Sequence, residues 1–133
     1  MALNLSLSVL VVDDASTMIR IIRNLLRQIG FRDIDEVQGG ATALAKMRSL
    51  VISDWNMEPI TGLDLLRQVR ADPNLGEIPF IMVTAETRTK NVIAAKDAGV
   101  NNYIVKPFNA QTLKAKIEAV FAEKAEPVPA PER

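Results

Sequence analysis

Four short apolar runs, each ending in polar residues, constrain the fold of this chain more than any other feature. Asp13 and Asp14 follow the first run, Asp54 ends the second, and Thr84 and Lys106 end the third and fourth. Continuous apolar runs are typical of parallel strands that are covered on both faces. Because ligands bind outside the carboxyl ends of such strands, these side chains are predicted to meet at one edge. Three carboxylates, a hydroxyl and an ammonium indicate a site for a divalent cation and a phosphoryl group.

Composition bounds the class of protein. The chain has 133 residues, enough for one domain, of which 48% are hydrophobic and 24% charged, as in ordinary globular proteins. Basic and acidic residues number 16 each, so bulk charge predicts neither a nucleic-acid nor a membrane partner. Cysteine and histidine are absent from the sequence. Their absence excludes disulfides, thiol chemistry and a phosphohistidine relay within the chain.

The ends of the chain and its apolar runs suggest where the protein works. Residues 1–6 lack the basic start and long apolar core of a signal peptide. No apolar run approaches the length of a membrane span. We therefore expect a cytoplasmic protein.

Helical patterns alternate with the apolar runs. Apolar residues at helical spacing predict helices near residues 18–29, 42–48, 63–69, 90–98 and 113–121. Residues 34–37 are the weakest strand candidate. The alternation predicts an α/β fold with a single doubly wound, five-stranded parallel sheet and five helices. The domain is expected to span residues 1–124, and the proline-rich segment 125–133 to form a disordered tail.

One connection is unusually short. Only Ser49 separates the predicted helix ending at Arg48 from the strand beginning at Leu50, whereas such loops usually have about 2–6 residues. Either the helix is shorter than its pattern indicates, or residues are missing from the sequence. The loop lies at the amino edge of the sheet, away from the predicted site, so the site is unaffected.

Four motifs occur in the order of a known family: Asp13-Asp14, residues 51–57 (VISDWNM), Thr84-Ala85, and Lys106-Pro107-Phe108. The chain resembles the receiver domain of bacterial two-component response regulators, most closely a single-domain, CheY-like chemotaxis regulator. The resemblance covers roughly residues 7–124. It implies a flavodoxin-like, CheY-like fold.

The resemblance implies that Asp54 is a phosphoacceptor, taking a phosphoryl group from a histidine kinase or a phosphotransfer protein. It also implies Mg²⁺ (or Mn²⁺), held by Asp14, Asp54 and the backbone carbonyl of Asn56, with Asp13 acting through water. Such a cation would offset the charges that otherwise oppose attack by a carboxylate on phosphorus. Alternatively, Asp13-Asp14 caps the following helix near Ser16, and an isolated Asp54 would be a turn residue.

The same resemblance assigns phosphoryl-binding and switch residues. Lys106, joined to Pro107 by a cis bond in the family, would pair with the acyl phosphate; otherwise it is a solvated surface lysine. Thr84, followed by Ala85, would donate to the phosphoryl oxygens, and the ring of Tyr103 would turn from exposed to buried. The alternative for Tyr103 is core packing on a strand.

Three residues are expected to tune the site. The resemblance implies that Asn56 and Glu86 flank the site where, in the family, side chains influence how water reaches the acyl phosphate; both are polar here, which predicts a short-lived phosphoryl state. Glu58 departs from the family, which usually has proline four residues after the phosphoacceptor; here Pro59 follows one residue later. An extra carboxylate would alter the Mg²⁺ affinity or restrict partner access, unless Glu58 points to solvent. Trp55, the only tryptophan, offers a fluorescence reporter beside the metal.

We therefore expect a phosphorylation-activated signalling switch that autodephosphorylates but has no other enzymatic activity and no output domain. Its output face would comprise the fourth helix, fifth strand and fifth helix, with Tyr103, Lys114 and Lys116. Partners would be the kinase, a target such as a flagellar motor switch protein, and a phosphatase. The alternatives are a phosphorylation-independent adaptor and a Mg²⁺-dependent aspartyl-phosphate phosphotransferase; the second usually needs two aspartates two residues apart, where this chain has Asp54 and Asn56.

Overall fold

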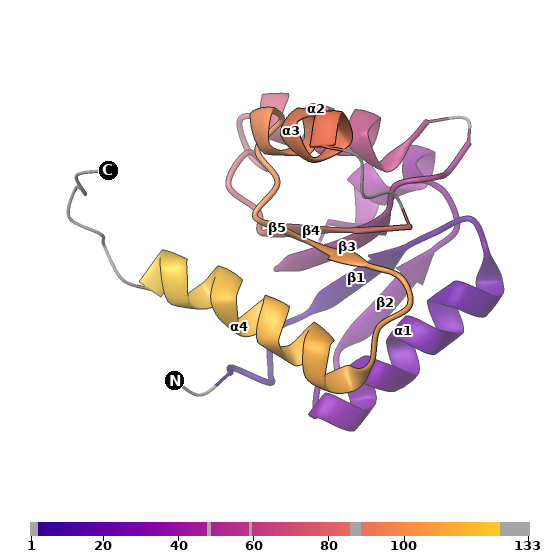
Figure 1. Ribbon diagram of the computed structural model, residues 1–133, viewed down its shortest axis with the longest axis vertical. Helices are drawn as coiled ribbons and strands as arrows, with labels where there is room; N and C mark the ends of the chain where they lie inside the picture. The colour runs from indigo at the N-terminus through magenta and orange to yellow at the C-terminus, as the bar shows by residue number, and fades with distance from the viewer. Residues whose placement is uncertain (1–2, 48, 59, 86–88, 126–133) are drawn as a thin grey trace.

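The computed structural model describes residues 3–47, 49–58, 60–85 and 89–125 (Figure 1). Five strands form one parallel sheet in the order β2-β1-β3-β4-β5: β1 (Val9–Val12), β2 (Ile34–Val37), β3 (Leu50–Asp54), β4 (Phe80–Thr84) and β5 (Asn102–Val105). The described helices are α1 (Ser16–Ile29), η1 (Gly40–Lys46), α2 (Gly62–Ala71), α3 (Thr89–Asp97) and α4 (Ala110–Ala125). None of these helices is long and apolar enough to cross a membrane.

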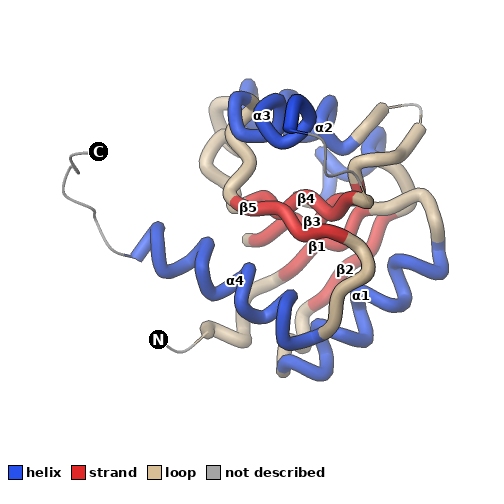
Figure 2. Tube along the Cα trace, in the orientation of Figure 1, coloured by secondary structure: helices blue, strands red, loops and turns tan. Residues whose placement is uncertain are grey.

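The sheet is the middle of three layers. Figure 2 shows α1 and α4 on one face, and α2 and α3 on the other. Successive residues of β1 explain why its run is continuously apolar: Val9 and Val11 pack towards α1 and α4, while Leu10 and Val12 pack towards α2 and η1. All four are fully buried. The predicted doubly wound, five-stranded parallel sheet is thus confirmed.

Four of the five predicted helices are α-helices, and the second is not. The segment expected as an α-helix over 42–48 forms the 3₁₀ helix η1, and Arg48 lies outside the described residues. Only residues 38–49 connect β2 to β3. A 3₁₀ helix rises about 2.0 Å per residue, against about 1.5 Å for an α-helix, so it spans this short crossover with fewer residues.

The structure describes only the first residue of the tail that was predicted over 125–133. Helix α4 continues to Ala125, the first residue of the predicted tail. Residues 126–133 lie outside the described residues, so the disorder of the tail stays a prediction.

Arg70 on α2 joins three segments at the amino edge of the sheet. Its Nε donates to the carbonyl of Gly99 at 2.9 Å, its Nη1 to the carbonyls of Ile78 at 2.7 Å and Gly76 at 3.2 Å, and its Nη2 to Oδ1 of Asn101 at 2.8 Å. The planar guanidinium allows one side chain to bridge these acceptors. Arg70 therefore ties α2 to the loops that precede β4 and β5.

We expect Arg70→Leu to lower the free energy of unfolding by about 2–3 kcal/mol, because several partly buried acceptors lose their donors. Arg70→Lys should recover less than half of this loss, since one ammonium cannot reach all of them. Urea unfolding measures both effects. Arg67→Leu, at an exposed position of the same helix, is the control and should change stability by no more than about 0.5 kcal/mol. An equally small change for Arg70→Leu would contradict the bridging role.

Candidate functional site

The parallel register brings the predicted side chains to one edge of the sheet. Val12 pairs with Ser53, Asp54 with Val83, and Thr84 with Val105, so the polar ends of neighbouring strands lie side by side. Asp13, Asp54 and Thr84 are 2–3% exposed. The structure therefore places two carboxylates and a hydroxyl in a buried position at this edge.

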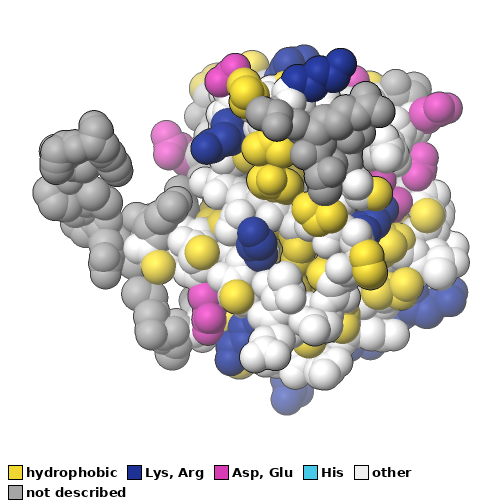
Figure 3. Space-filling view, viewed as in Figure 1, with side chains coloured by type: hydrophobic (Ala, Val, Ile, Leu, Met, Phe, Trp, Pro, Cys, Tyr) yellow, Lys and Arg dark blue, Asp and Glu magenta, His cyan; other side chains and the backbone are white. Residues whose placement is uncertain are grey.

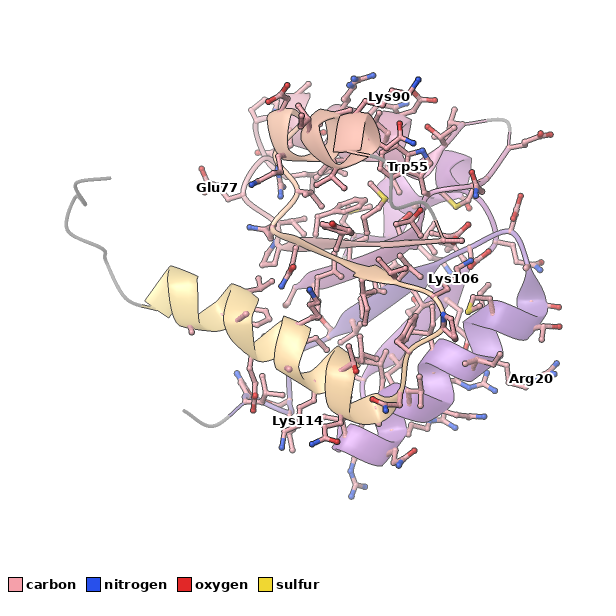
Figure 4. All side chains as sticks on the ribbon, in the orientation of Figure 1. Arg20, Trp55, Glu77, Lys90, Lys106 and Lys114 are labelled. Carbon is pink, nitrogen blue, oxygen red and sulfur yellow. The ribbon has the colours of Figure 1, made fainter. Side chains whose placement is uncertain are left out.

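The side chain of Lys106 points towards Asp54 at the same edge of the sheet. Its Nζ lies 2.7 Å from Oδ1 of Asp54, and its backbone N–H donates to the carbonyl of Thr84 at 2.8 Å. The expected cis bond between Lys106 and Pro107 is present. Figure 4 shows Lys106 at the carboxyl end of β5. The alternative of a freely solvated lysine does not describe this structure, in which the ammonium offsets the charge of Asp54.

Asp13 is the most perturbed acid of the site. Its Oδ1 accepts a hydrogen bond from the backbone N–H of Ala15 at 3.0 Å, while its buried Oδ2 has no hydrogen-bond partner among the described residues. Burial raises the pKa of Asp13 to about 6, and the charges of Asp54 and Asp14 add to the rise; the Ala15 N–H and Lys106 oppose it. Capping does not explain this acid, because the N-cap of α1 is Ala15 and no side chain caps the helix.

Asp14 lies at the open side of the site. It is exposed, and its Oδ2 accepts a hydrogen bond from the backbone N–H of Glu58 at 3.3 Å. A cavity of about 530 Å³ adjoins it, lined by Asp14, Asn56, Met57, Glu58 and Thr61. This cavity lies on the Asp14 side of the site, beside the loop that follows β3. The sequence did not indicate the bond from Glu58, because a backbone N–H leaves no signal in residue types.

The N-terminal end of α2 packs closely against the backbone of Asp54. A Cβ on Gly62 would collide with the carbonyl oxygen of Asp54 and the sulfur of Met82, so only glycine permits this approach. Gly62 N–H also donates to the carbonyl of Trp55 at 2.8 Å. Thr61 and Asp64 form a reciprocal capping box at the same helix end. The Thr-Gly pair before an apolar helical pattern was the available sequence signal for this contact.

The remaining predicted residues are placed as follows. Tyr103 is half-buried on β5, beside Met82 in the register, and the Nζ of Lys116 lies 5.8 Å from its ring centroid. Ala85 is exposed directly after Thr84, and Asn56 is exposed in the loop after β3. Glu86 lies outside the described residues, so its expected role stays a prediction.

The oxygen donors at this edge suit a hard divalent cation. In the part of the chain that the structure describes, Asp13 Oδ2 lacks a hydrogen-bond partner, and Asp54 Oδ1 is paired only with the ammonium of Lys106. Carboxylate and carbonyl oxygens are the ligands that Mg²⁺ and Mn²⁺ prefer. Within the described ranges no three carboxylates form a ready cluster, so a cation here would also need backbone carbonyl or water oxygens as ligands.

The raised pKa of Asp13 predicts a pH-dependent stability. Between about pH 4 and pH 6 the folded protein binds more protons than the unfolded chain, so the free energy of unfolding falls as the pH rises through this range. Asp13→Asn removes the buried charge and keeps an acceptor for Ala15. Without divalent cations we expect this variant to be more stable than the wild type by about 1–3 kcal/mol at neutral pH, and equally stable near pH 4.

Urea unfolding in a chelator at several pH values measures this difference. Asp33→Asn, at an exposed position before β2, is the matched control and should show no such pH dependence. If the free energies of unfolding of Asp13→Asn and the wild type differed by the same amount at every pH from about 4 to neutral, the raised pKa of Asp13 would be contradicted.

Comparisons with known proteins agree with this geometry. The sequence profile of the response regulator receiver domain matches residues 9–118. The chain is 52% identical over 119 residues to the chemotaxis protein CheY of Pseudomonas aeruginosa, covering 86% of this chain and 96% of that protein. It is 47% identical over 123 residues to the chemotaxis protein CheY-3 of Vibrio cholerae, covering 90% and 95%.

Solved structures give the same result. The chemotaxis response regulator CheY4 of Vibrio cholerae superposes with a TM-score of 0.79 at 30% identity, covering 86% of this chain and 98% of that one. At 24% identity, the receiver domain of the sensor histidine kinase PA1611 from Pseudomonas aeruginosa, with a magnesium ion coordinated in its active site cleft, shares the fold, with a TM-score of 0.76 and coverage of 87% and 98%. The chain therefore belongs to the response regulator receiver domain family and is similar to chemotaxis regulators of the CheY type.

Proposed function

We propose that this protein is a signalling switch of a chemotaxis pathway that is turned on by phosphorylation of Asp54. One observation carries the proposal: a buried carboxylate at a strand end faces an ammonium at 2.7 Å, with a second buried carboxylate and a hydroxyl beside it. A nucleophile held next to a compensating cation is suited to accept a dianionic phosphoryl group.

In the proposed reaction, a carboxylate oxygen of Asp54 attacks the phosphorus of a phosphohistidine on a kinase or phosphotransfer protein. The P–N bond breaks, its electron pair stays on that ring nitrogen, and the imidazole leaves neutral because its other nitrogen already carries a proton; an acyl phosphate forms on Asp54. Lys106 then pairs with a phosphoryl oxygen. Water later attacks phosphorus, the bond to Asp54 breaks, and the carboxylate and inorganic phosphate are released. Asn56 and Glu86 are proposed to influence this water.

The site would hold Mg²⁺ or Mn²⁺ through Asp14, Asp54 and the backbone carbonyl of Asn56, with Asp13 acting through a water molecule. The bound cation supplies neutralisation of the charge that builds up during phosphoryl transfer. The donor chemistry of these residues and the magnesium-bound relative PA1611 support this assignment.

The output is proposed to follow from a two-state change at Thr84 and Tyr103. Thr84 would donate to the phosphoryl oxygens, drawing in the chain at Ala85 and letting the half-buried Tyr103 ring turn inward. The affected face comprises α3, β5 and α4, the elements expected as fourth helix, fifth strand and fifth helix. Figure 3 looks onto β5 and shows hydrophobic side chains gathered between α3 and α4 beside basic ones.

This face offers the contacts that a protein target needs. Ile93 on α3 is 51% exposed, and Lys114 on α4 is exposed. Lys116 lies over the ring of Tyr103. The proposed partners are a histidine kinase or phosphotransfer protein, a target such as a flagellar motor switch protein, and a phosphatase. The proposed setting is the cytoplasm, without nucleic acid and without reactions on other substrates.

The test uses Trp55 as the reporter. We expect Mg²⁺ to quench its fluorescence, and acetyl phosphate then to cause a further, reversible change together with the mass gain of one phosphoryl group. Asp54→Asn should lose the second change and the mass gain, because no carboxylate remains to accept phosphorus. Asp33→Asn, an exposed acid far from the site, should behave as the wild type.

Metal-dependent quenching with an unchanged mass would contradict the proposal and favour an adaptor that works without phosphorylation. Persistence of the phosphorylated form for many hours without a phosphatase would contradict autodephosphorylation alone. Turnover of phosphomonoesters would instead favour a phosphotransferase.

A further inference from the structure

We propose that Glu58 tunes this site in two ways. Its backbone N–H holds Asp14 in place, and its carboxylate favours a divalent cation while disfavouring small dianionic phosphodonors. The inference rests on the proposed function, because it concerns the cation and the donor of the same site.

The loop that carries Glu58 is fixed by its neighbours. The N–H of Trp55 donates to the carbonyl of Val83 at 2.9 Å, and Met57 is 3% exposed in the core under η1 and α2. Beyond the loop, the capping box of Thr61 fixes the start of α2. The position of the Glu58 backbone is therefore set by the packing of the loop rather than by its own exposed side chain.

The backbone N–H of Glu58 donates a hydrogen bond to the carboxylate of Asp14. The bond to Oδ2 is 3.3 Å long, at the weak end of the range for an N–H donor. Asp14 is exposed, so without this bond its carboxylate would have more rotamers available. A proline, which the family usually has at this position, carries no N–H and cannot make the bond. The hydrogen bond is thus a feature of Glu58 that its replacement by proline removes.

The carboxylate of Glu58 adds a further negative charge at the mouth of the site. Glu58 is exposed and lines the cavity of about 530 Å³ together with Asp14 and Asn56. A charge there attracts a cation and repels an anion that enters by the same opening. Because the side chain is solvated, we expect each effect to be only about two- to fivefold, and to fade at high salt.

The charge is tested with Glu58→Gln, which keeps the N–H. Titration of Trp55 fluorescence should show a Kd for Mg²⁺ about threefold higher than that of the wild type, with the difference lost near 1 M salt, where the Debye length is about 3 Å. At saturating Mg²⁺, acetyl phosphate should phosphorylate the variant about twice as fast. Phosphoramidate, which carries less negative charge at neutral pH, should show a smaller gain.

The N–H is tested with Glu58→Pro, whose folding is checked by urea unfolding. Its Kd for Mg²⁺ should exceed that of Glu58→Gln, and the excess should persist at high salt because it comes from a lost hydrogen bond rather than from a charge. Equal values for the two variants would overturn the role of the N–H.

Glu77→Gln is the matched control, since Glu77 is exposed at the amino edge of the sheet, away from Trp55 and Lys106 (Figure 4). It should leave both measurements unchanged. A Glu58→Gln variant that matches the wild type in Kd and rate would overturn the role of the charge. If the wild type itself neither responds to Mg²⁺ nor gains mass, the proposed function fails, and this result is separate from any comparison of variants.

Discussion

The parallel register of the five strands is the constraint on which the rest of the structure depends. It aligns the carboxyl ends of β1, β3, β4 and β5, so that residues far apart in the sequence become neighbours. It also requires both faces of the sheet to be covered, which accounts for the apolar strands and the two helical layers. Fold and site are therefore two results of one arrangement.

Crowding of negative charge follows directly from that arrangement. Asp13 and Asp54 lie buried within the same crevice, and burial together with neighbouring carboxylates raises the pKa of Asp13. Lys106 relieves part of the repulsion through its ion pair with Asp54. Under the proposed function, the charge that is costly for folding would also attract the cation, so the stability of the protein and its cation binding would be opposed at Asp13.

The sequence predicted the structure correctly where residue type and the spacing of apolar residues distinguish strands, helices and strand ends. Apolar runs located the strands, and the polar residues that end them located Asp13, Asp54, Thr84 and Lys106 at one edge. It was incomplete for η1: the short connection to β3 raised the alternative of a shortened helix, but residue types did not predict that the segment forms a 3₁₀ helix. It also missed contacts made through the backbone, such as the N–H of Glu58, since these depend on tertiary packing rather than on side-chain type.

The bond from Arg70 to the carbonyl of Gly99 has a mechanical consequence for α3. Gly99 lies two residues beyond Asp97, the last residue of that helix, whereas the helix begins at Thr89, a few residues after Thr84 and Ala85. A movement of α3 that preserves this bond is a swing about its C-terminal end. The displacement would then be largest near Lys90, at the N-terminal end of α3, and smallest at Gly99, so the helix would pivot at the amino edge of the sheet.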